Sequence, residues 1–147
     1  MASPLEIRQE LERLARLHGG VLTPEAVVKA ARPKSSVLHS RFEWDDSDAA
    51  EKYRLWQARQ LMRVVVQYEA VGTREPVEVR VMTSLSTDRS GDTRGYRVTT
   101  AVLEDPAHRA QLLADAKEEM RKFQAKYQQL TELAEVFIAM ENVIGAA

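Results

Sequence analysis

The stretch D-A-A-E-K-Y-R-L-W-Q-A-R-Q-L-M-R-V-V-V-Q-Y-E-A, residues 48–70, decides how the rest of the chain is interpreted. On a helical wheel, its apolar side chains gather on one side: Ala50, Ala58, Leu61, Val64, Val65 and Tyr68. The opposite side carries polar or aromatic residues spaced 4, 3 and 4 apart: Lys52, Trp56, Arg59 and Arg63. The stretch therefore predicts a helix from about Asp48 to Ala70, with one buried face and one cationic face.

Two shorter helices are predicted before this one. The first runs over residues 5–17, begins at Ser3-Pro4 and ends at Gly19-Gly20. The second runs over residues 25–31, with Thr23 as its N-cap, and ends because Pro33 disfavours helical geometry at the residue before it. Residues 34–44 are predicted to be irregular but packed, since they include four large apolar side chains: Val37, Leu38, Phe42 and Trp44.

After residues 48–70, two segments alternate apolar and polar side chains with the period of a half-buried strand, at 77–85 and 96–102. The polar residues 86–95 between them read as a long hairpin loop. Three helices followed by a hairpin is the order of a winged helix, with the third helix as the recognition helix and the hairpin as the wing. We therefore expect an α+β, mainly helical chain with a winged-helix-like domain over residues 1–105, although other α+β domains share this order.

Residues 107–144 contain neither Gly nor Pro and carry apolar side chains at alternating spacings of 3 and 4. This seam lasts for more than four heptads, which predicts a long C-terminal helix and coiled-coil pairing within residues 106–147. A continuous helix of that length would extend for about 55 Å, farther than a small domain can cover. We expect it to form a homo-oligomer; the alternative is a hairpin that folds back near Thr131.

Composition excludes several classes of protein. The 147 residues include no Cys, which excludes disulfides, thiolate metal sites and iron–sulfur clusters. No apolar run reaches the roughly 18 residues of a membrane span, and the first residues lack the apolar core of a signal peptide. We therefore expect a cytoplasmic protein with no membrane partner. A net charge of −1 also argues against a polycation that binds nucleic acid nonspecifically.

Basic residues nevertheless gather in three places: residues 26–42, which contain no acid, the polar face of the third helix, and the hairpin loop with its exit, where Arg97 lies. Cations at such positions would contact DNA phosphates. The predicted DNA-binding residues are Lys29, Arg32, Lys34, His39, Arg41, Lys52, Arg59, Arg63, Arg89 and Arg94. The competing interpretation is an ordinary solvated surface, in which Asp88 and Asp92 partly offset the loop arginines and Trp56 packs beneath the hairpin or against the terminal helix.

Motifs for catalysis are absent. The sequence has neither a phosphate-binding Gly-rich loop before Lys and Ser/Thr nor a Gly-x-Ser-x-Gly elbow. Asp45, Asp46 and Asp48 are dense enough for an oxygen-ligand metal site, but they lack the Gly and Glu of a calcium loop. Capping of the third helix by Asp45, Asp46 or Ser47 explains them more simply. No catalytic residue, metal or cofactor is predicted.

Several short segments of the sequence resemble those of a family of short phage and prophage proteins. They are L-T-P-E-A-V-V at 22–28, L-H at 38–39 and F-E-W-D-D-S at 42–47, followed by Y-R at 53–54 and Q-A-R at 57–59. Weaker likeness continues through S-L at 84–85, D-R at 88–89 and G-Y-R at 95–97. Val37 stands where the family has Pro. The resemblance implies a phage context and the cytoplasm of a host cell, but no activity.

Taken together, the sequence predicts a non-enzymatic DNA-binding protein of phage type that oligomerises through its C-terminal helix. The alternative is a protein-interaction or assembly module, such as an adaptor or a structural phage component. In it the heptad seam itself supplies the function, and Phe42, Trp44 and Trp56 are packing residues or anchors for a partner.

Overall fold

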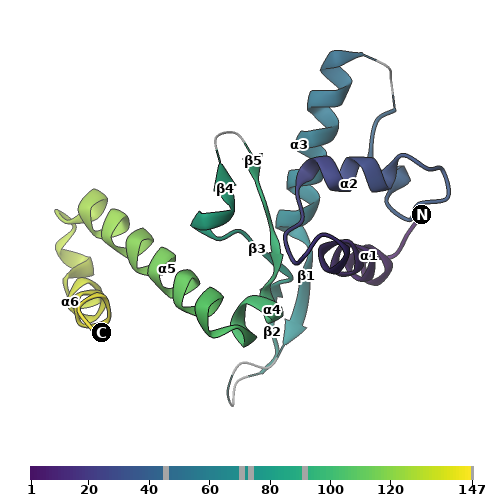
Figure 1. Ribbon diagram of the computed structural model, residues 1–147. Helices are drawn as coiled ribbons and strands as arrows, with labels where there is room; N and C mark the ends of the chain where they lie inside the picture. The colour runs from purple at the N-terminus through teal and green to yellow at the C-terminus, as the bar shows by residue number, and fades with distance from the viewer. Residues whose placement is uncertain (45–46, 70–71, 73–74, 91–92, 147) are drawn as a thin grey trace.

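The computed structural model describes residues 1–44, 47–69, 72, 75–90 and 93–146, and over these the chain is α+β and mostly helical (Figure 1). The elements in chain order are α1 (Pro4–Leu17), α2 (Pro24–Ala31), η1 (His39–Arg41), α3 (Asp48–Val64), β1 (Val66–Glu69), β2 (Val77–Arg80), β3 (Met82–Thr83), η2 (Ser86–Asp88), β4 (Arg89–Ser90), β5 (Thr93–Arg94), β6 (Arg97–Val98), α4 (Thr99–Glu104), α5 (Pro106–Tyr127), η3 (Thr131–Leu133) and α6 (Ala134–Ile144).

The first two helices form as predicted, because their ends are encoded locally. Ser3 accepts a hydrogen bond from the backbone N–H of Glu6, and the Glu6 carboxylate accepts one from the backbone N–H of Ser3 at 2.7 Å. Thr23 caps α2 through the N–H of Ala26. Gly19 ends α1 with a φ of 69°, which a residue with a Cβ rarely adopts.

These helices, α3 and the strands enclose one apolar core. Its largest fully buried side chains come from segments far apart in the sequence: Leu11, Leu22, Leu38, Met62, Met82 and Leu85. An isolated antiparallel bridge between Leu22 and Tyr96 ties the link between α1 and α2 to the strands. The N-terminal helices and the strands therefore fold as one unit.

Helix α3 is shorter than predicted. It ends at Val64, and Val65 is extended, with φ −66° and ψ 119°. Three consecutive β-branched residues, 64–66, lose side-chain freedom in a helix and suit a strand. The chain continues directly into β1, which pairs antiparallel with β2, so the expected helix to Ala70 is wrong beyond Val64. Val64, expected on the buried face, is exposed.

The strands pair differently from the predicted hairpin. The segment 77–85 is divided at Val81 into β2, which pairs with β1, and β3, which pairs with β6. The second predicted strand, 96–102, keeps only β6 as a strand, and α4 begins at Thr99. Local alternation could not show this, because the partner of β2 lies in a segment that was expected to be helical. The segment 86–95, expected to be a loop, contains η2 and the short antiparallel pair β4–β5.

The C-terminal region is two helices rather than one. Helix α5 ends at Tyr127, and the chain passes through η3 into α6, which returns along α5. Gln124 donates to Glu141 at 2.7 Å, and Lys117 donates to the carbonyl of Ala146 at 2.9 Å. The fold-back lies near Thr131, which was the alternative to a continuous helix. We call residues 106–146 the arm.

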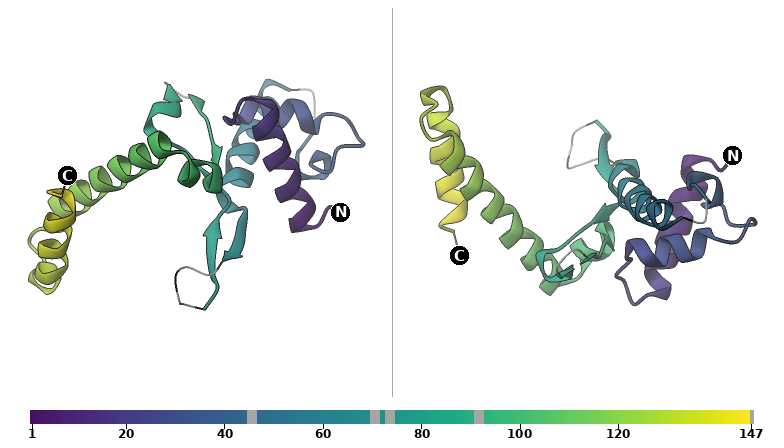
Figure 2. Two further views of the ribbon diagram at one scale, coloured as in Figure 1. Left: turned by 60° about the horizontal axis from the view of Figure 1, so that its bottom comes forward. Right: turned by 90° about the horizontal axis from the view of Figure 1, so that it is seen from above.

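Figure 2 shows the arm extending away from the three N-terminal helices in both views. Asp105 closes α4 and caps α5, accepting from the backbone N–H groups of Ala107 and His108. These hydrogen bonds, led by the one from His108, lower the pKa of Asp105. The arm thus begins at a capped junction, and the first half of α5 also contacts Ser86 through Gln111 and Asp115.

Candidate nucleic-acid interface

Four arginine side chains from four different elements line one groove. They are Arg63 at the end of α3, Arg80 in β2, Arg89 in β4 and Arg94 in β5. The groove has a volume of about 310 Å³, and α5 supplies its opposite wall through Leu112, Asp115, Ala116 and Glu119. We call it the arginine groove. The sequence singled out Arg63, Arg89 and Arg94 but placed them in two separate patches, and the fold brings them together.

Three of these four guanidinium groups carry unshared charge. Arg63, Arg80 and Arg94 are exposed and have no hydrogen-bond or ion-pair partner for their side chains among the described residues. Arg89 is held in place, because it donates to the carbonyl of Ser84 at 2.7 Å. Cations that lack a protein partner in a concave site raise the local potential and attract anions.

Asp115 is the better anchored of the two acids on the wall of the groove. Its carboxylate accepts from the backbone N–H of Ser86 at 2.8 Å, from the Ser86 hydroxyl, and from Gln111 Nε2 at 2.9 Å. Burial alone would raise the pKa of Asp115, but the hydrogen bonds from Ser86 and Gln111 and the charge of Arg89 lower it overall. Asp115 thus fixes α5 against the segment that carries Arg89. Four cations and two anions leave the groove with a net charge of +2.

An ion pair joins η2 to β6. Arg97 Nε lies 2.6 Å from Asp88 Oδ2, and the Asp88 side chain is only 8% exposed. This hydrogen bond raises the pKa of Arg97. Asp88 was expected to offset the arginines of the loop and its exit, and it does so for Arg97. Among the described residues, no ion pair joins Asp88 to Arg89 or Arg94. Asp92, the other expected offset, lies outside the described residues.

The basic segment at 26–42 is built around Trp44, and much of it is structural. The His39 ring stacks on the Trp44 ring, with 4.9 Å between the ring centroids and 8° between the ring planes. His39 Nδ1 lies 2.9 Å from the carbonyl oxygen of Ala31 at the end of α2. Trp44 Nε1 donates to the His39 carbonyl at 2.9 Å. The prediction that His39 contacts DNA finds no support in this geometry, since His39 Nδ1 is committed to Ala31 and one ring face to Trp44.

Arg54, which the sequence analysis did not single out, also contacts the Trp44 ring. It is 4% exposed, its guanidinium lies 5.3 Å from the Trp44 ring, and it donates to the Glu43 carbonyl at 2.8 Å. It also pairs with Glu51 at 2.8 Å, and Arg32 pairs with the same carboxylate at 3.1 Å. The hydrogen bond from Arg54 is the main cause of the lowered pKa of Glu51.

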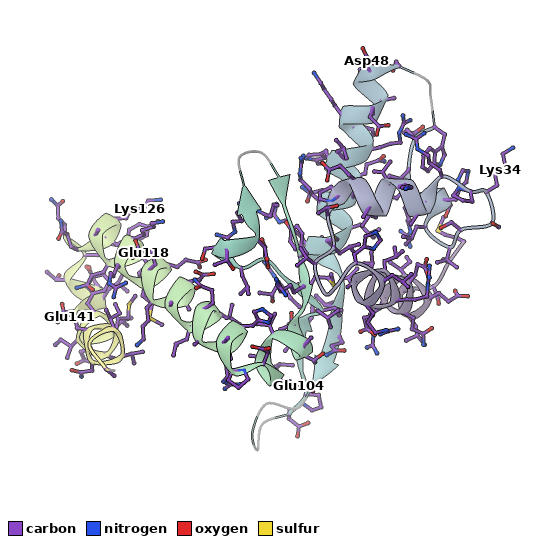
Figure 3. All side chains as sticks on the ribbon, viewed as in Figure 1. Lys34, Asp48, Glu104, Glu118, Lys126 and Glu141 are labelled. Atoms are coloured by element: carbon purple, nitrogen blue, oxygen red, sulfur yellow. The ribbon has the colours of Figure 1, made fainter. Side chains whose placement is uncertain are left out.

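The remaining predicted contacts do not converge. Arg41 is half-buried and donates to the carbonyl of Ala2 at 3.5 Å. Lys29 and Lys34 are exposed on α2 and the loop after it, and Figure 3 places Lys34 at the end of the molecule opposite the arm. Lys52 and Arg59 lie on α3, exposed and half-buried respectively, N-terminal to the arginine groove.

The acidic cluster before α3 is only partly described. Asp45 and Asp46 lie outside the described residues, and Ser47 is the observed N-cap, accepting from the N–H of Ala50 at 3.1 Å. Of the candidates Asp45, Asp46 and Ser47, the last therefore caps the helix. Within the part of the chain that the structure describes, no three His, Asp or Glu side chains gather as metal ligands would.

Comparisons with family models, curated proteins and solved structures found no match to this chain. No helix among the described residues is long and apolar enough to cross a bilayer.

Proposed function

We propose that this chain is a non-enzymatic DNA-binding protein of phage type that holds backbone phosphates in the arginine groove. The observation that carries the proposal is the convergence of Arg63, Arg80 and Arg94, none of which has a side-chain partner among the described residues. Arginine forks match phosphate oxygens in geometry and charge, and such contacts supply most of the affinity of nucleic-acid-binding proteins.

The proposal keeps the winged-helix interpretation only in a modified form. The order of three helices and strands agrees with it, as does the bridge from Leu22 to Tyr96. The connection between α2 and α3 spans residues 32–47, much longer than the three- or four-residue turn of a helix-turn-helix. In our proposal, DNA therefore approaches the end of α3 and the β4–β5 pair rather than an exposed recognition helix.

Salt dependence of binding tests the proposal. The logarithm of the affinity for duplex DNA falls with the logarithm of salt concentration by about 0.9 per phosphate contact. The double variant Arg63→Ala/Arg80→Ala removes two such contacts, so its slope should be shallower than that of the wild type by about 1.8. Fluorescence anisotropy with a labelled duplex at four salt concentrations measures both slopes.

The matched control is Lys29→Ala/Lys34→Ala, which removes the same charge from the other end of the molecule. We expect its slope to equal that of the wild type. If both double variants had equally shallower slopes, binding would depend on net charge alone. An unchanged slope in Arg63→Ala/Arg80→Ala would show that the arginine groove does not bind phosphates.

The second part of the proposal is that the arm pairs with the arm of a second copy. Phe137 is the one residue of the described arm that is buried, and several large apolar side chains are exposed along it: Leu113, Phe123, Leu130, Val136, Ile138 and Val143. The ordering of about 40 residues costs roughly 1–2 kcal/mol each in backbone entropy, which so little burial does not offset.

Charge favours a second copy as the occupant. Residues 120–127 carry Arg121, Lys122 and Lys126 and no acid, whereas residues 128–146 carry Glu132, Glu135 and Glu141 and no base. Figure 3 shows Lys126 and Glu141 on the same outer part of the arm. An antiparallel pair of arms would place the acidic α6 of one copy on the basic end of α5 in the other, with the apolar stripe between them.

Sedimentation equilibrium tests this part directly. We expect a dimer or a higher oligomer for the wild type, and a monomer for Val136→Glu/Val143→Glu. The control Leu5→Glu/Leu17→Glu changes two comparably exposed apolar residues on α1 and should leave the mass unchanged. A monomeric wild type at 100 micromolar would contradict the pairing. An assembly module, the alternative function, would then need a different partner chain.

A further inference from the structure

Two aromatic rings on α3 are exposed and stacked on each other. Tyr53 is 47% exposed and Trp56 is 49% exposed, and their ring centroids lie 5.6 Å apart with planes inclined by 12°. Large aromatic side chains are usually buried, so two neighbouring ones left in solvent call for an explanation. The sequence-based alternative, in which Trp56 packs beneath the hairpin, is not what the structure shows.

Trp56 lies on the same face of α3 as the cations that lead to the arginine groove. Lys52 precedes it by 4 residues and Arg63 follows it by 7, so both are near whole numbers of helical turns away. At 1.5 Å per residue, Trp56 is about 10 Å along the helix from Arg63. At 3.4 Å or more per nucleotide, no more than about three nucleotides bridge that distance.

Trp44, the other tryptophan of the chain, differs from Trp56 because other side chains pack against its ring. Trp44 has the His39 ring stacked on it and the guanidinium of Arg54 at 5.3 Å. Trp56 has no such contact other than Tyr53 among the described residues. Figure 3 shows Asp48, the first residue of α3, at the outer tip of that helix. In this half of α3, Arg54 is buried against Trp44, whereas Tyr53 and Trp56 are exposed.

We infer that the Tyr53–Trp56 pair stacks on unpaired bases, so that the proposed nucleic-acid site takes a single strand whose phosphates lie in the arginine groove. This inference rests on the proposed function. Duplex bases stack on one another and offer no free face to a side chain, whereas unpaired bases stack on aromatic rings. The side chains around the pair favour nucleic acid over a protein partner, because Lys52, Arg59 and Gln60 are cationic or amide rather than aliphatic.

The experiment compares a labelled 15-nucleotide oligothymidylate with a duplex of the same length, by anisotropy at one salt concentration. Loss of one stacked base reduces affinity roughly 5- to 150-fold. We expect Trp56→Ala, and separately Tyr53→Ala, to lose this much for oligothymidylate and less than about twofold for the duplex. Trp56→Phe, which keeps a ring, should retain most of the affinity. The salt slope of Trp56→Ala should equal that of the wild type, because no phosphate contact is removed.

Three outcomes would overturn the inference. In the first, the wild type binds the duplex and Trp56→Ala and Tyr53→Ala leave oligothymidylate binding unchanged; the phosphate site then stands, and the aromatic pair belongs to a protein partner. In the second, both variants weaken duplex and single strand equally. In the third, the wild type binds neither nucleic acid, which overturns the proposed function as well. Circular dichroism of each variant confirms that an exposed ring can be removed without unfolding the chain.

Discussion

Replacing Arg54 by methionine should destabilise the fold far more than most arginine substitutions. Its side chain is 5% exposed, so methionine keeps the aliphatic packing and removes only the guanidinium. The lost interactions include hydrogen bonds to the Glu43 carbonyl and Glu51 and the contact with Trp44. A hydrogen bond from a charged group contributes about 1.5–3 kcal/mol, and a desolvated cation–π contact up to about 2 kcal/mol. The pairing with Glu51 adds little, since Glu51 is 42% exposed.

Arg54→Met should therefore lower the free energy of unfolding by about 3 kcal/mol. For a chain of this size, each 1 kcal/mol lowers the melting temperature by roughly 2–4 °C, so Arg54→Met should melt about 6–12 °C below the wild type. Thermal unfolding followed by circular dichroism at 222 nm measures this shift.

Arg32→Met is the matched control, because Arg32 contacts the same Glu51 and the same Trp44 but is 54% exposed. Its loss should stay below about 1 kcal/mol. If the two variants melted at the same temperature, burial of Arg54 would not be the source of its contribution, and the reasoning from burial would fail.

Three further predictions concern single residues. Gly95→Ala should lower the free energy of unfolding by about 1–3 kcal/mol, and so lower the urea midpoint at an unchanged m-value, because an added Cβ would lie 2.5 Å from Val21 Cγ1. The lowered pKa values of Glu51 and Asp115 stabilise the fold above their ordinary values of 4.5 and 3.8, and this contribution is lost as pH falls through the lower folded-state values. The free energy of unfolding should therefore fall between roughly pH 5 and pH 2, and less steeply in Asp115→Asn, as measured by urea titration at each pH. His39→Ala should lower the free energy of unfolding by about 1–2 kcal/mol, measured by thermal unfolding, without changing the affinity for nucleic acid, since its ring stacks on Trp44 and bonds the end of α2. A changed affinity would place His39 in the interface.

The N-termini of the first three α-helices were predictable because their capping signals are local. Ser3, Thr23 and Ser47 each accept from a backbone N–H three residues later, and a cap of this kind depends on no distant contact. The end of α3 was not predictable in the same way. Residues 64–66 read as a continuation of the apolar face, and only their pairing with residues 80–81 turns them into the start of a strand. Because this pairing is nonlocal, the sequence analysis also predicted the wrong partner for the first part of the segment 77–85, which pairs with β1.

The arginine groove was half predictable for a related reason. Arg63, Arg89 and Arg94 were recognisable as surface cations, but their convergence depends on how α3, the strands and α5 pack. Arg80 stood on the polar face of a correctly expected strand, and this alternation was the one available signal for it. Arg54 and Arg59 are both arginines on α3, and the sequence offered no means of telling the buried one from the half-buried one. The distinction comes from Trp44, which reaches α3 from an irregular segment.

The way the structure uses its arginines is itself an argument for function. Arg54, Arg32 and Arg97 pair with carboxylates, so these side chains contribute to the fold. The arginine groove does the opposite, because it gathers four like charges against two acids, and one of these, Asp115, is committed to Ser86 and Gln111. Like charges held near each other repel, which lowers the stability of the folded chain. Folding alone does not explain such an arrangement in a chain whose net charge is only −1. An anion that enters the groove would relieve the repulsion, and this relief is the free energy that the proposed site contributes to binding.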